Sequence, residues 1–212
     1  MTKPFSLTAM SVKKSLHHML DILFPPTEDQ MIVRELTEND INVLYKTYMF
    51  QNIQISAQFA DRKVRALLHE AKFHHNQKAL HMAGLLLDRL IGPYVRPDTI
   101  CIPVPLSKTR LRQRGYNQVL EILRSSRHAA EASVNNSALI RTRDTKPQTD
   151  LPRHERLLNV ADAFVVQDPE VLLGRQVFLI DDVVTTGATL AAAKNALLKC
   201  GPESVTCFAV AH

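Results

Sequence analysis

The stretch richest in reactive side chains is FLIDDVVTTGATL, residues 178–190. Two adjacent carboxylates, Asp181 and Asp182, follow an apolar run and precede three threonines and one glycine. Ionised aspartates only accept hydrogen bonds, so they suit hydroxyl donors or a cation. Hydroxyls, backbone N–H groups and the positive end of a following helix suit a phosphate. A sugar phosphate offers both kinds of group in one molecule.

Other nucleotide-binding motifs fit this stretch less well. A Walker loop needs GxxxxGK[ST], and no lysine follows Gly187; a dinucleotide fingerprint needs GxGxxG, and only one glycine is present. The plain alternative is a strand that ends in two solvated aspartates before a capped helix. A cap needs one polar side chain, whereas this loop carries five, so a binding loop is the favoured interpretation.

The positive charge of the chain is concentrated in two short stretches. The net charge is +5 at pH 7. Residues 106–118 hold four cations and no acid, and residues 141–156 hold five cations against three acids, so the remainder is slightly negative. Arginine forks bind pyrophosphate bidentately, which predicts an anionic partner for a basic loop at Lys108, Arg110, Arg112 and Arg114, about two of them facing it. A purely solubilising loop and, for the second stretch, a basic linker are the alternatives.

The elements that must position these groups alternate between strands and helices. Short β-branched runs occur at TICIPVP, SALI, QVFLID and SVTCFAVA, with helical segments after Asn117 and over residues 189–199. This alternation predicts an α/β domain with a mainly parallel sheet of about five strands. The acid pair then falls at the carboxyl end of a central strand, where such sheets bind ligands. Apolar periodicity also predicts helices over 61–74 and 77–90, and one before Pro25 and Pro26.

Composition narrows the class of protein. The 212 residues with 45% hydrophobic content suffice for one domain plus an extension. No apolar run reaches the length of a membrane helix and the N-terminal residues lack a signal-peptide core, so we expect a cytoplasmic protein without membrane insertion. Three widely spaced cysteines predict reduced, buried thiols and no disulfide framework or CxxC metal site.

At this point three stretches resemble a known family. VFLIDDVVTTGATL resembles the ribose-phosphate loop of type I phosphoribosyltransferases, and CIPVPLSKTRLRQRGYNQ and RTRDTKPQTDLPRHERLLNVADAF are similar to two further signatures of the ComF family. ComF proteins are phosphoribosyltransferase-like proteins associated with natural competence. The resemblance implies a helical N-terminal extension or hood over residues 1–58 and a phosphoribosyltransferase-like domain over 59–212. VRALLHEAKFHHNQKALHMAGLLL, with its Lys72-Phe73 pair, is similar to the family's first helices.

The resemblance also implies roles for individual residues. Asp181 and Asp182 would contact the ribose of phosphoribosyl pyrophosphate (PRPP), bound with Mg²⁺ that is held through the substrate. The basic residues Arg143 and Lys146, in a segment that closes over substrate in transferases, would join the acid pair in catalysis. The remaining expected PRPP contacts are Val183, Val184, Thr185, Thr186, Gly187, Ala188, Thr189, Pro105 and Leu106.

Three functions stay open at this level. The first is transfer of the phosphoribosyl group to an unknown nitrogen nucleophile. The second is a PRPP-binding competence factor that engages single-stranded DNA and the competence machinery, and the third is a PRPP-sensing regulator without turnover. Many members carry a four-cysteine zinc module after LDILFPP, and this chain has no cysteine there. His17 and His18 are more typical of ordinary helix-end histidines than of substitute zinc ligands. The acceptor and the oligomeric state are not predicted.

Overall fold

A central sheet organises the molecule and brings the carboxyl ends of its parallel strands to one edge. The computed structural model describes residues 25–142 and 163–212. Within them the main sheet has six strands in the order β1-β2-β8-β7-β3-β4, and a second sheet pairs β5 with β6. The strands are β1 (Tyr48–Phe50), β2 (Ile53–Ala57), β3 (Ile100–Pro103), β4 (Ser133–Val134), β5 (Leu139–Arg141), β6 (Phe164–Val166), β7 (Gln176–Val183) and β8 (Ser204–Ala211).

The main sheet has the predicted direction. Strands β2, β8, β7, β3 and β4 pair in parallel, and β1 adds an antiparallel edge strand to β2. The hairpin of β1 and β2 turns at Gln51 and Asn52, which both have positive φ, a conformation that asparagine tolerates better than most residues. The α/β fold with a mainly parallel sheet of about five strands is therefore confirmed.

Helices flank this sheet on both faces. The described helices are α2 (Glu28–Glu35), α3 (Glu38–Leu44), α4 (Arg62–Phe73), α5 (Gln77–Ile91), α6 (Lys108–Arg114), α7 (Gln118–Arg124), α8 (Arg127–Glu131) and α10 (Ala188–Leu198), with short 3₁₀ turns η1 (Gly92–Tyr94) and η3 (Pro169–Val171). The predicted helices over 61–74, 77–90 and 189–199 correspond to α4, α5 and α10. The helix predicted before Pro25 lies outside the described residues.

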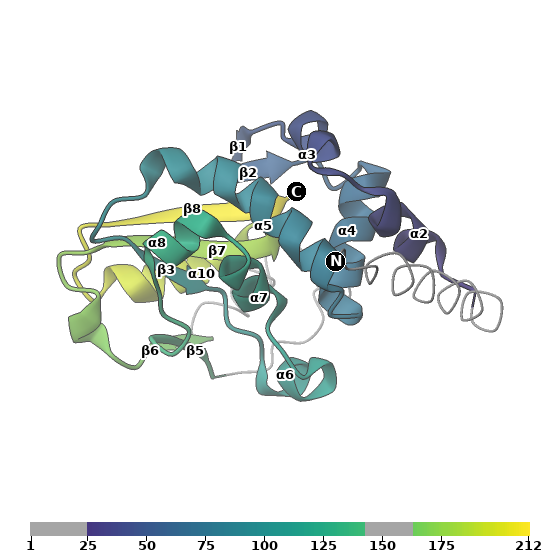
Figure 1. Cartoon of the computed structure of the whole chain (residues 1–212). Helices are drawn as coiled ribbons and strands as arrows, with labels where there is room; N and C mark the ends of the chain where they lie inside the picture. The colour runs from purple at the N-terminus through teal and green to yellow at the C-terminus, as the bar shows by residue number, and fades with distance from the viewer. Residues whose placement is uncertain (1–24, 143–162) are drawn as a thin grey trace, which may run out of the picture.

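Alternate residues of β7 pack into two separate cores. Phe178 and Ile180 join a core formed with helices α2 to α5, α7 and α8, whereas Val177 and Leu179 join one formed with α10 and the β5–β6 pair. All four side chains are fully buried, as expected for a central parallel strand. Figure 1 shows the long helix α5 and the shorter α7 crossing the sheet next to the strands that they cover. Among the described helices, none has both the length and the apolarity to cross a bilayer.

Two expected elements differ from the structure. Residues 137–140 were expected as a strand of the parallel sheet but lead into β5, which pairs antiparallel with β6. The cause is local, because Asn135 Oδ1 accepts from Ser137 N at 3.0 Å and Ala138 N at 2.8 Å and turns the chain away after β4. Residues 108–114, expected as a loop, form helix α6.

Helix α6 begins and ends with recognisable caps. The Ser107 hydroxyl accepts from Arg110 N at 3.3 Å, and Gly115 ends the helix in the left-handed conformation at φ 82°. Serine at the first position and glycine after the last are the residues that helix ends favour. A loop was predicted here because four cations lie close together, although Ser107 and Gly115 are typical residues for the two ends of a helix.

The three cysteines are free, and the predicted burial is confirmed for Cys101 and Cys207 but not for Cys200. Cys101 and Cys207 are buried, and Cys200 is partly exposed. Burial raises the pKa of Cys101 to about 12 and that of Cys207 to about 11. Both thiols are therefore protonated and unreactive at neutral pH.

Candidate functional site

The connections after β3 and β7 leave the sheet in opposite directions. The chain after β3 continues through α7 and α8, which pack on one face, whereas β7 is followed by α10 on the other face. Neighbouring parallel strands whose connections diverge in this way open a crevice at their carboxyl ends. Pairing of β3 with β7 ends at Pro103 and Ile180, one residue before Asp181. The acid pair therefore lies at the mouth of this crevice.

Asp182 is buried and fully engaged by donors. The residue is only 6% exposed. Oδ2 accepts from Gln118 Nε2 at 2.9 Å, and Oδ1 accepts from the Val183 backbone N–H at 2.8 Å. An ionised carboxylate buried in this way needs such donors to offset its desolvation. The position of this carboxylate is thus fixed before any ligand binds.

Asp181 has a different environment. It is partly exposed, and its Oδ1 accepts from the Asp182 backbone N–H at 2.9 Å. Although Asp181 keeps some exposed surface, partial removal of its carboxyl group from water raises its pKa well above the ordinary value of 3.8, and the adjacent Asp182 carboxylate raises it further. Lys72, at the end of α4, opposes that rise. A cation or hydroxyl donors at Asp181 would stabilise the ionised form and reverse the shift.

The loop between β7 and α10 has the geometry of an anion cradle. Gly187 adopts φ 72° and starts α10 without a side-chain cap of its own. The Ala188 backbone N–H reaches Thr186 Oγ1 only at 3.5 Å, so the first turn of α10 still offers backbone N–H groups to an anion. A Cβ on Gly187 would meet Gln51 Oε1 at 2.8 Å, but that atom ends a flexible, exposed side chain that can move aside, so the positive φ is the reason for glycine here. A hollow of about 30 Å³ is formed here by Asp181, Val183, Val184, Thr185, Thr186, Gly187, Thr189 and Leu190.

This hollow contains most of the residues predicted from the loop. It brings Asp181, three threonines and Gly187 together, whereas Asp182 points away toward α7 and Ala188 is buried in the first turn of α10. The Val184 backbone N–H is engaged by Ala211 O at 2.9 Å, and the Val184 side chain is buried. Val184 therefore helps to shape the loop, but its backbone N–H is not available to a ligand.

A chain of side chains links the basic helix α6 to the acid pair. The Arg114 guanidinium donates to Gln118 Oε1, and Gln118 Nε2 donates to Asp182 Oδ2. Arginine can only donate and ionised aspartate can only accept, so the amide of Gln118 has one possible orientation. Burial lowers the pKa of Arg114, while the nearby Asp182 raises it. Gln118 is itself 3% exposed, and it was not among the predicted site residues.

The four cations of α6 separate into two faces. Positions four apart share one side of a helix, so Arg110 and Arg114 lie together and line a hollow of about 160 Å³ with Phe73 and Gln113. The Arg114 guanidinium also lies 5.4 Å from the centre of the Phe73 ring. Lys108 lines a different cavity, and Lys108, Arg110 and Arg112 are all exposed.

That second cavity is the larger one, with a volume of about 690 Å³. It lies between α6, α7 and the start of β5–β6, and Pro105 and Leu106, which follow β3, contribute to its wall. Its remaining lining residues are Lys108, Leu111, Gly115, Tyr116, Asn117, Leu120, Glu121, Arg124, Asn136, Leu139, Ile140, Arg141, Thr142 and Gln167. The predicted residues Arg143 and Lys146 lie outside the described residues.

The turn between α4 and α5 completes the surroundings of the site. The Tyr116 hydroxyl donates to Ala71 O and accepts from His75 N, both at 2.9 Å, which ties this turn to the loop after α6. Lys72 and Phe73 are thereby held beside Arg114 and the acid pair. The sequence indicated the Lys72-Phe73 pair only through family similarity, because the hydrogen bonds that place it join residues 41 and 45 positions apart.

Comparison with known proteins agrees with this architecture. The fold is that of a type I phosphoribosyltransferase, and the family model described as "Phosphoribosyl transferase domain" matches residues 78–212. Competence protein F of Haemophilus influenzae is 29% identical over 189 residues, which cover 88% of this chain and 74% of that protein. DNA utilization protein YhgH of Escherichia coli O157:H7 is 32% identical over 169 residues, 76% and 72% of the two chains.

A further relative is competence protein ComFC of Streptococcus pneumoniae, 29% identical over 109 residues, which cover 51% of this chain and 46% of that protein. Together with the matched domain, these relatives identify the chain: it belongs to the ComF family of phosphoribosyltransferase-like proteins.

Proposed function

We propose that this protein binds Mg²⁺–PRPP at the crevice between β3 and β7 and displaces pyrophosphate with a nitrogen nucleophile. The observation that carries the proposal is the acid pair at the end of β7, followed directly by a threonine-rich loop and an uncapped helix start. The hollow of that loop would receive the 5′-phosphate of PRPP. Asp181, which lines the same hollow, would accept hydrogen bonds from the ribose hydroxyls.

The donor set also fits Mg²⁺, which prefers oxygen ligands and is usually bound through carboxylates and substrate phosphates. Asp181 and Asp182 offer only carboxylate oxygens. The pKa of Asp181 is raised by removal from water and by the adjacent Asp182 charge, and one backbone donor and Lys72 do not cancel that rise, so a bound cation would stabilise the ionised form. When bound with the substrate, the ion would neutralise part of the pyrophosphate charge.

In the proposed reaction, the nucleophile nitrogen forms a bond to C1 of the ribose as the bond from C1 to the pyrophosphate oxygen breaks. The leaving group takes the electron pair, and the ribose carries positive charge in the transition state. The ionised acid pair would hold the ribose, and Lys72 and the Arg110–Arg114 face of α6 would stabilise the departing anion. The 690 Å³ cavity beside Pro105 offers space for a nucleophile. Arg143 and Lys146 remain proposed contributors.

Calorimetric titration with PRPP, with and without Mg²⁺, tests the binding step. We expect binding that depends on Mg²⁺ and weakens about 10- to 100-fold on replacement of either Asp181 or Asp182 by Asn, because a charged acceptor is lost. Unchanged affinity in both variants would remove the site assignment. Pyrophosphate release that depends on an added nitrogen compound would then establish transfer, whereas tight binding without release would favour a PRPP sensor.

A second candidate function is binding of single-stranded DNA by a PRPP-binding competence factor. It is favoured by two observations: the relatives are named as competence and DNA utilization proteins, and Lys108, Arg110 and Arg112 are exposed on one short helix. A cluster of exposed cations suits a phosphate backbone. Tyr116 is the one aromatic residue in residues 106–118, so base stacking would contribute little there.

A further inference from the structure

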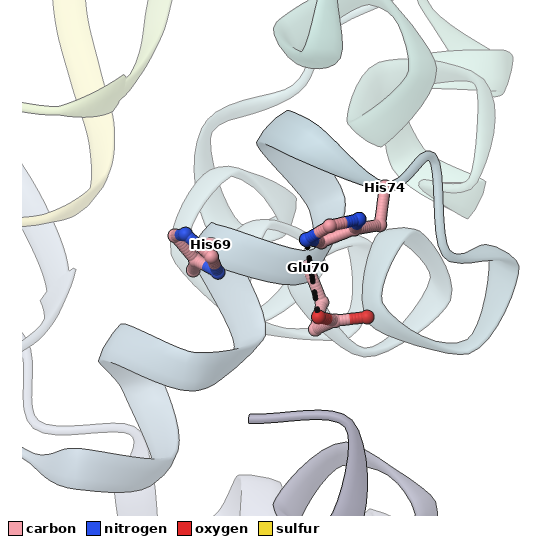
Figure 2. Close-up of side chains that lie close together, drawn as sticks. All are labelled: His69, Glu70 and His74. Atoms are coloured by element: carbon pink, nitrogen blue, oxygen red, sulfur yellow. Dashed lines mark ion pairs between the residues drawn. The ribbon is translucent and has the colours of Figure 1, made fainter. Parts of the chain in front are cut away.

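Three side chains at the C-terminal end of α4 form a cluster of metal-ligand type. His69, Glu70 and His74 each place one ligand atom within 4.8 Å of the others. Figure 2 shows the three gathered at this helix end, with the pair between His74 and Glu70 marked. The cluster is separate from the acid pair and from the loop after β7. The function proposed above does not use these three side chains.

Glu70 supplies the decisive observation. Its side chain is 1% exposed, and its Oε1 has no hydrogen-bond partner among the described residues. The other oxygen, Oε2, accepts from Asn76 Nδ2 at 3.1 Å. A buried carboxylate oxygen without a donor costs free energy that proteins rarely leave uncompensated. The nearest cationic candidate is His74 Nε2, at 3.8 Å, which is beyond hydrogen-bond distance.

The orientation of this carboxylate is fixed by its neighbour. Asn76 caps helix α5 with its Oδ1, which accepts from the backbone N–H groups of Lys78 and Ala79 at 3.1 and 3.3 Å. The Asn76 amide therefore cannot turn over, and its Nδ2 must face Glu70. One carboxylate oxygen of Glu70 therefore faces the Asn76 amide, and the other faces His74.

His69 is oriented in the manner of a metal ligand. Its Nδ1 lies 3.0 Å from the Asp29 carboxylate on α2, which leaves Nε2 available. A carboxylate that holds the second ring nitrogen of a histidine fixes its tautomer and increases its basicity as a ligand. His69 and His74 are each about half exposed, so an ion can reach the cluster from solvent.

We propose that His69, Glu70 and His74 bind a divalent transition ion, with Zn²⁺ as the best match. Two imidazoles and one carboxylate form a three-residue set that leaves one tetrahedral position open. Tetrahedral Zn²⁺ requires about 3.4 Å between ligand atoms, so the 3.8 Å between Glu70 and His74 is nearly suitable. The three ligand atoms lie within 4.8 Å of one another, so the half-exposed His69 ring would have to move by at most about 1.4 Å. Occupancy would tie α2 to the turn that carries Lys72 and Phe73.

The experiment is a titration of the chelator-treated, tag-free full chain with Zn²⁺ alone, in competition with a chromophoric chelator. Co²⁺ provides a second readout, because its visible absorption reports nitrogen and oxygen ligation. We expect one ion per chain, and binding at least about tenfold weaker in each of H69A, H74A and E70Q. Glu70→Gln keeps an oxygen for Asn76 and removes only the negative charge, so circular dichroism should show a folded variant.

Matched variants locate the site. His81→Ala removes an exposed histidine from α5, and the double variant H17A/H18A removes another histidine pair of the chain; both should bind Zn²⁺ as the original chain does. Asp29→Asn should weaken binding by about 10-fold or more, because an outer partner of a ligand is lost. The proposal is overturned if the original chain binds no Zn²⁺, or if H69A and H74A bind it with unchanged affinity.

Discussion

Asp181 and Asp182 are consecutive residues whose carboxyl groups have opposite surroundings. Asp182 is buried and accepts from Gln118 and from the Val183 backbone. Asp181 is partly exposed, has one backbone donor, and has a raised pKa because of burial and the neighbouring charge. One aspartate is thus satisfied without ligand, and the other is satisfied only when a ligand arrives. Their replacements should therefore differ in the ligand-free protein.

Asp181→Asn should stabilise the ligand-free protein, and Asp182→Asn should destabilise it. A raised pKa in the folded state means that ionised Asp181 opposes folding at pH 7, so the neutral amide should add about 0.5–2 kcal/mol. An amide in place of the Asp182 carboxylate has one acceptor oxygen for two donors, so one donor stays unpaired at a cost of about 1–3 kcal/mol. Urea denaturation of both variants measures the two changes. Shifts in the same direction would contradict the assignment of the two environments.

The raised pKa of Asp181 also predicts how PRPP affinity depends on pH. The ligand needs the ionised form of Asp181. PRPP affinity should therefore rise with pH, by at most about tenfold per pH unit, until the pH exceeds the raised pKa, and then level off. Calorimetry over a pH series provides the measurement. Asp181→Asn supplies the baseline, because it retains only the titration of the ligand's own phosphates. An identical pH profile in the two proteins would show that Asp181 does not titrate on binding.

Gln118 is predicted to act by positioning Asp182. Gln118→Leu leaves Arg114 and Asp182 without their shared partner, and Gln118→Glu places a second carboxylate against Asp182 while keeping the bond to Arg114. We expect both to weaken Mg²⁺–PRPP binding, Glu more than Leu, by about tenfold or more. Leu120→Ala, in the same helix but outside this chain of bonds, is the control. Affinity like that of the original chain in Gln118→Glu would disprove the role.

At the scale of elements, α6 places charges of the same kind on two faces with different neighbours. Arg110 and Arg114 lie beside Phe73, whereas Lys108 lines the 690 Å³ cavity. The four cations occur at every second position, and in a loop this spacing would not determine which way they point. In the helix capped by Ser107 and Gly115, Lys108 and Arg112 share one face and Arg110 and Arg114 share another. Two double variants can therefore separate small-ligand binding from polyanion binding at equal change of charge.

The variants K108A/R112A and R110A/R114A should differ in PRPP affinity and agree in their effect on single-stranded DNA. Only the second breaks the bond from Arg114 to Gln118, so only it should weaken Mg²⁺–PRPP binding. Each should reduce the salt dependence of DNA affinity by up to about 1.4 in log–log slope, because each removes two phosphate contacts. Fluorescence anisotropy over a salt series provides the DNA data. No binding at low salt would discard the DNA function, and equal losses of PRPP affinity would contradict the two-face assignment.

Sequence patterns predicted some elements and residues better than others. Strand β7, its acid pair and helix α10 are set by local signals: a continuous apolar run, then polar residues, then helical periodicity. Residues 137–140 were assigned to the wrong sheet, because an Asn135 side chain, and not the apolar run itself, decides which strand they pair with. Gln118 was missed for a related reason, since its two partners are brought together only by the packing of α6 and α7 against β7.

At the scale of the whole molecule, ligand binding at the site and folding of the sheet are thermodynamically linked. The acid pair belongs to β7, which is buried on both faces and paired with β3 and β8. A ligand held at the end of this strand is bound by the folded state and lost on unfolding. Its binding free energy should therefore add to the stability of the entire α/β domain.

Mg²⁺–PRPP at 100 times its Kd should raise the stability by about 2.7 kcal/mol, which corresponds to roughly 5–10 °C in Tm for a chain of this size. Thermal denaturation monitored by circular dichroism provides the measurement, and Mg²⁺ or PRPP alone serves as control. Asp182→Asn should show a much smaller increase. A shift of equal size in that variant would mean that the ligand binds elsewhere.

The pairing of β2 with β8 has a consequence for synthesis of the chain. Ile53 is opposite Cys207, about 150 residues later, so β2 has only the short strand β1 beside it until β8 has left the ribosome. At roughly 5–20 residues per second, that interval lasts about 8–30 seconds. During it an apolar strand with an unpaired edge is exposed in the nascent chain, and such edges associate with other chains. Because β2 is synthesised long before its partner β8, we expect chaperones to bind the β1–β2 segment of the nascent chain.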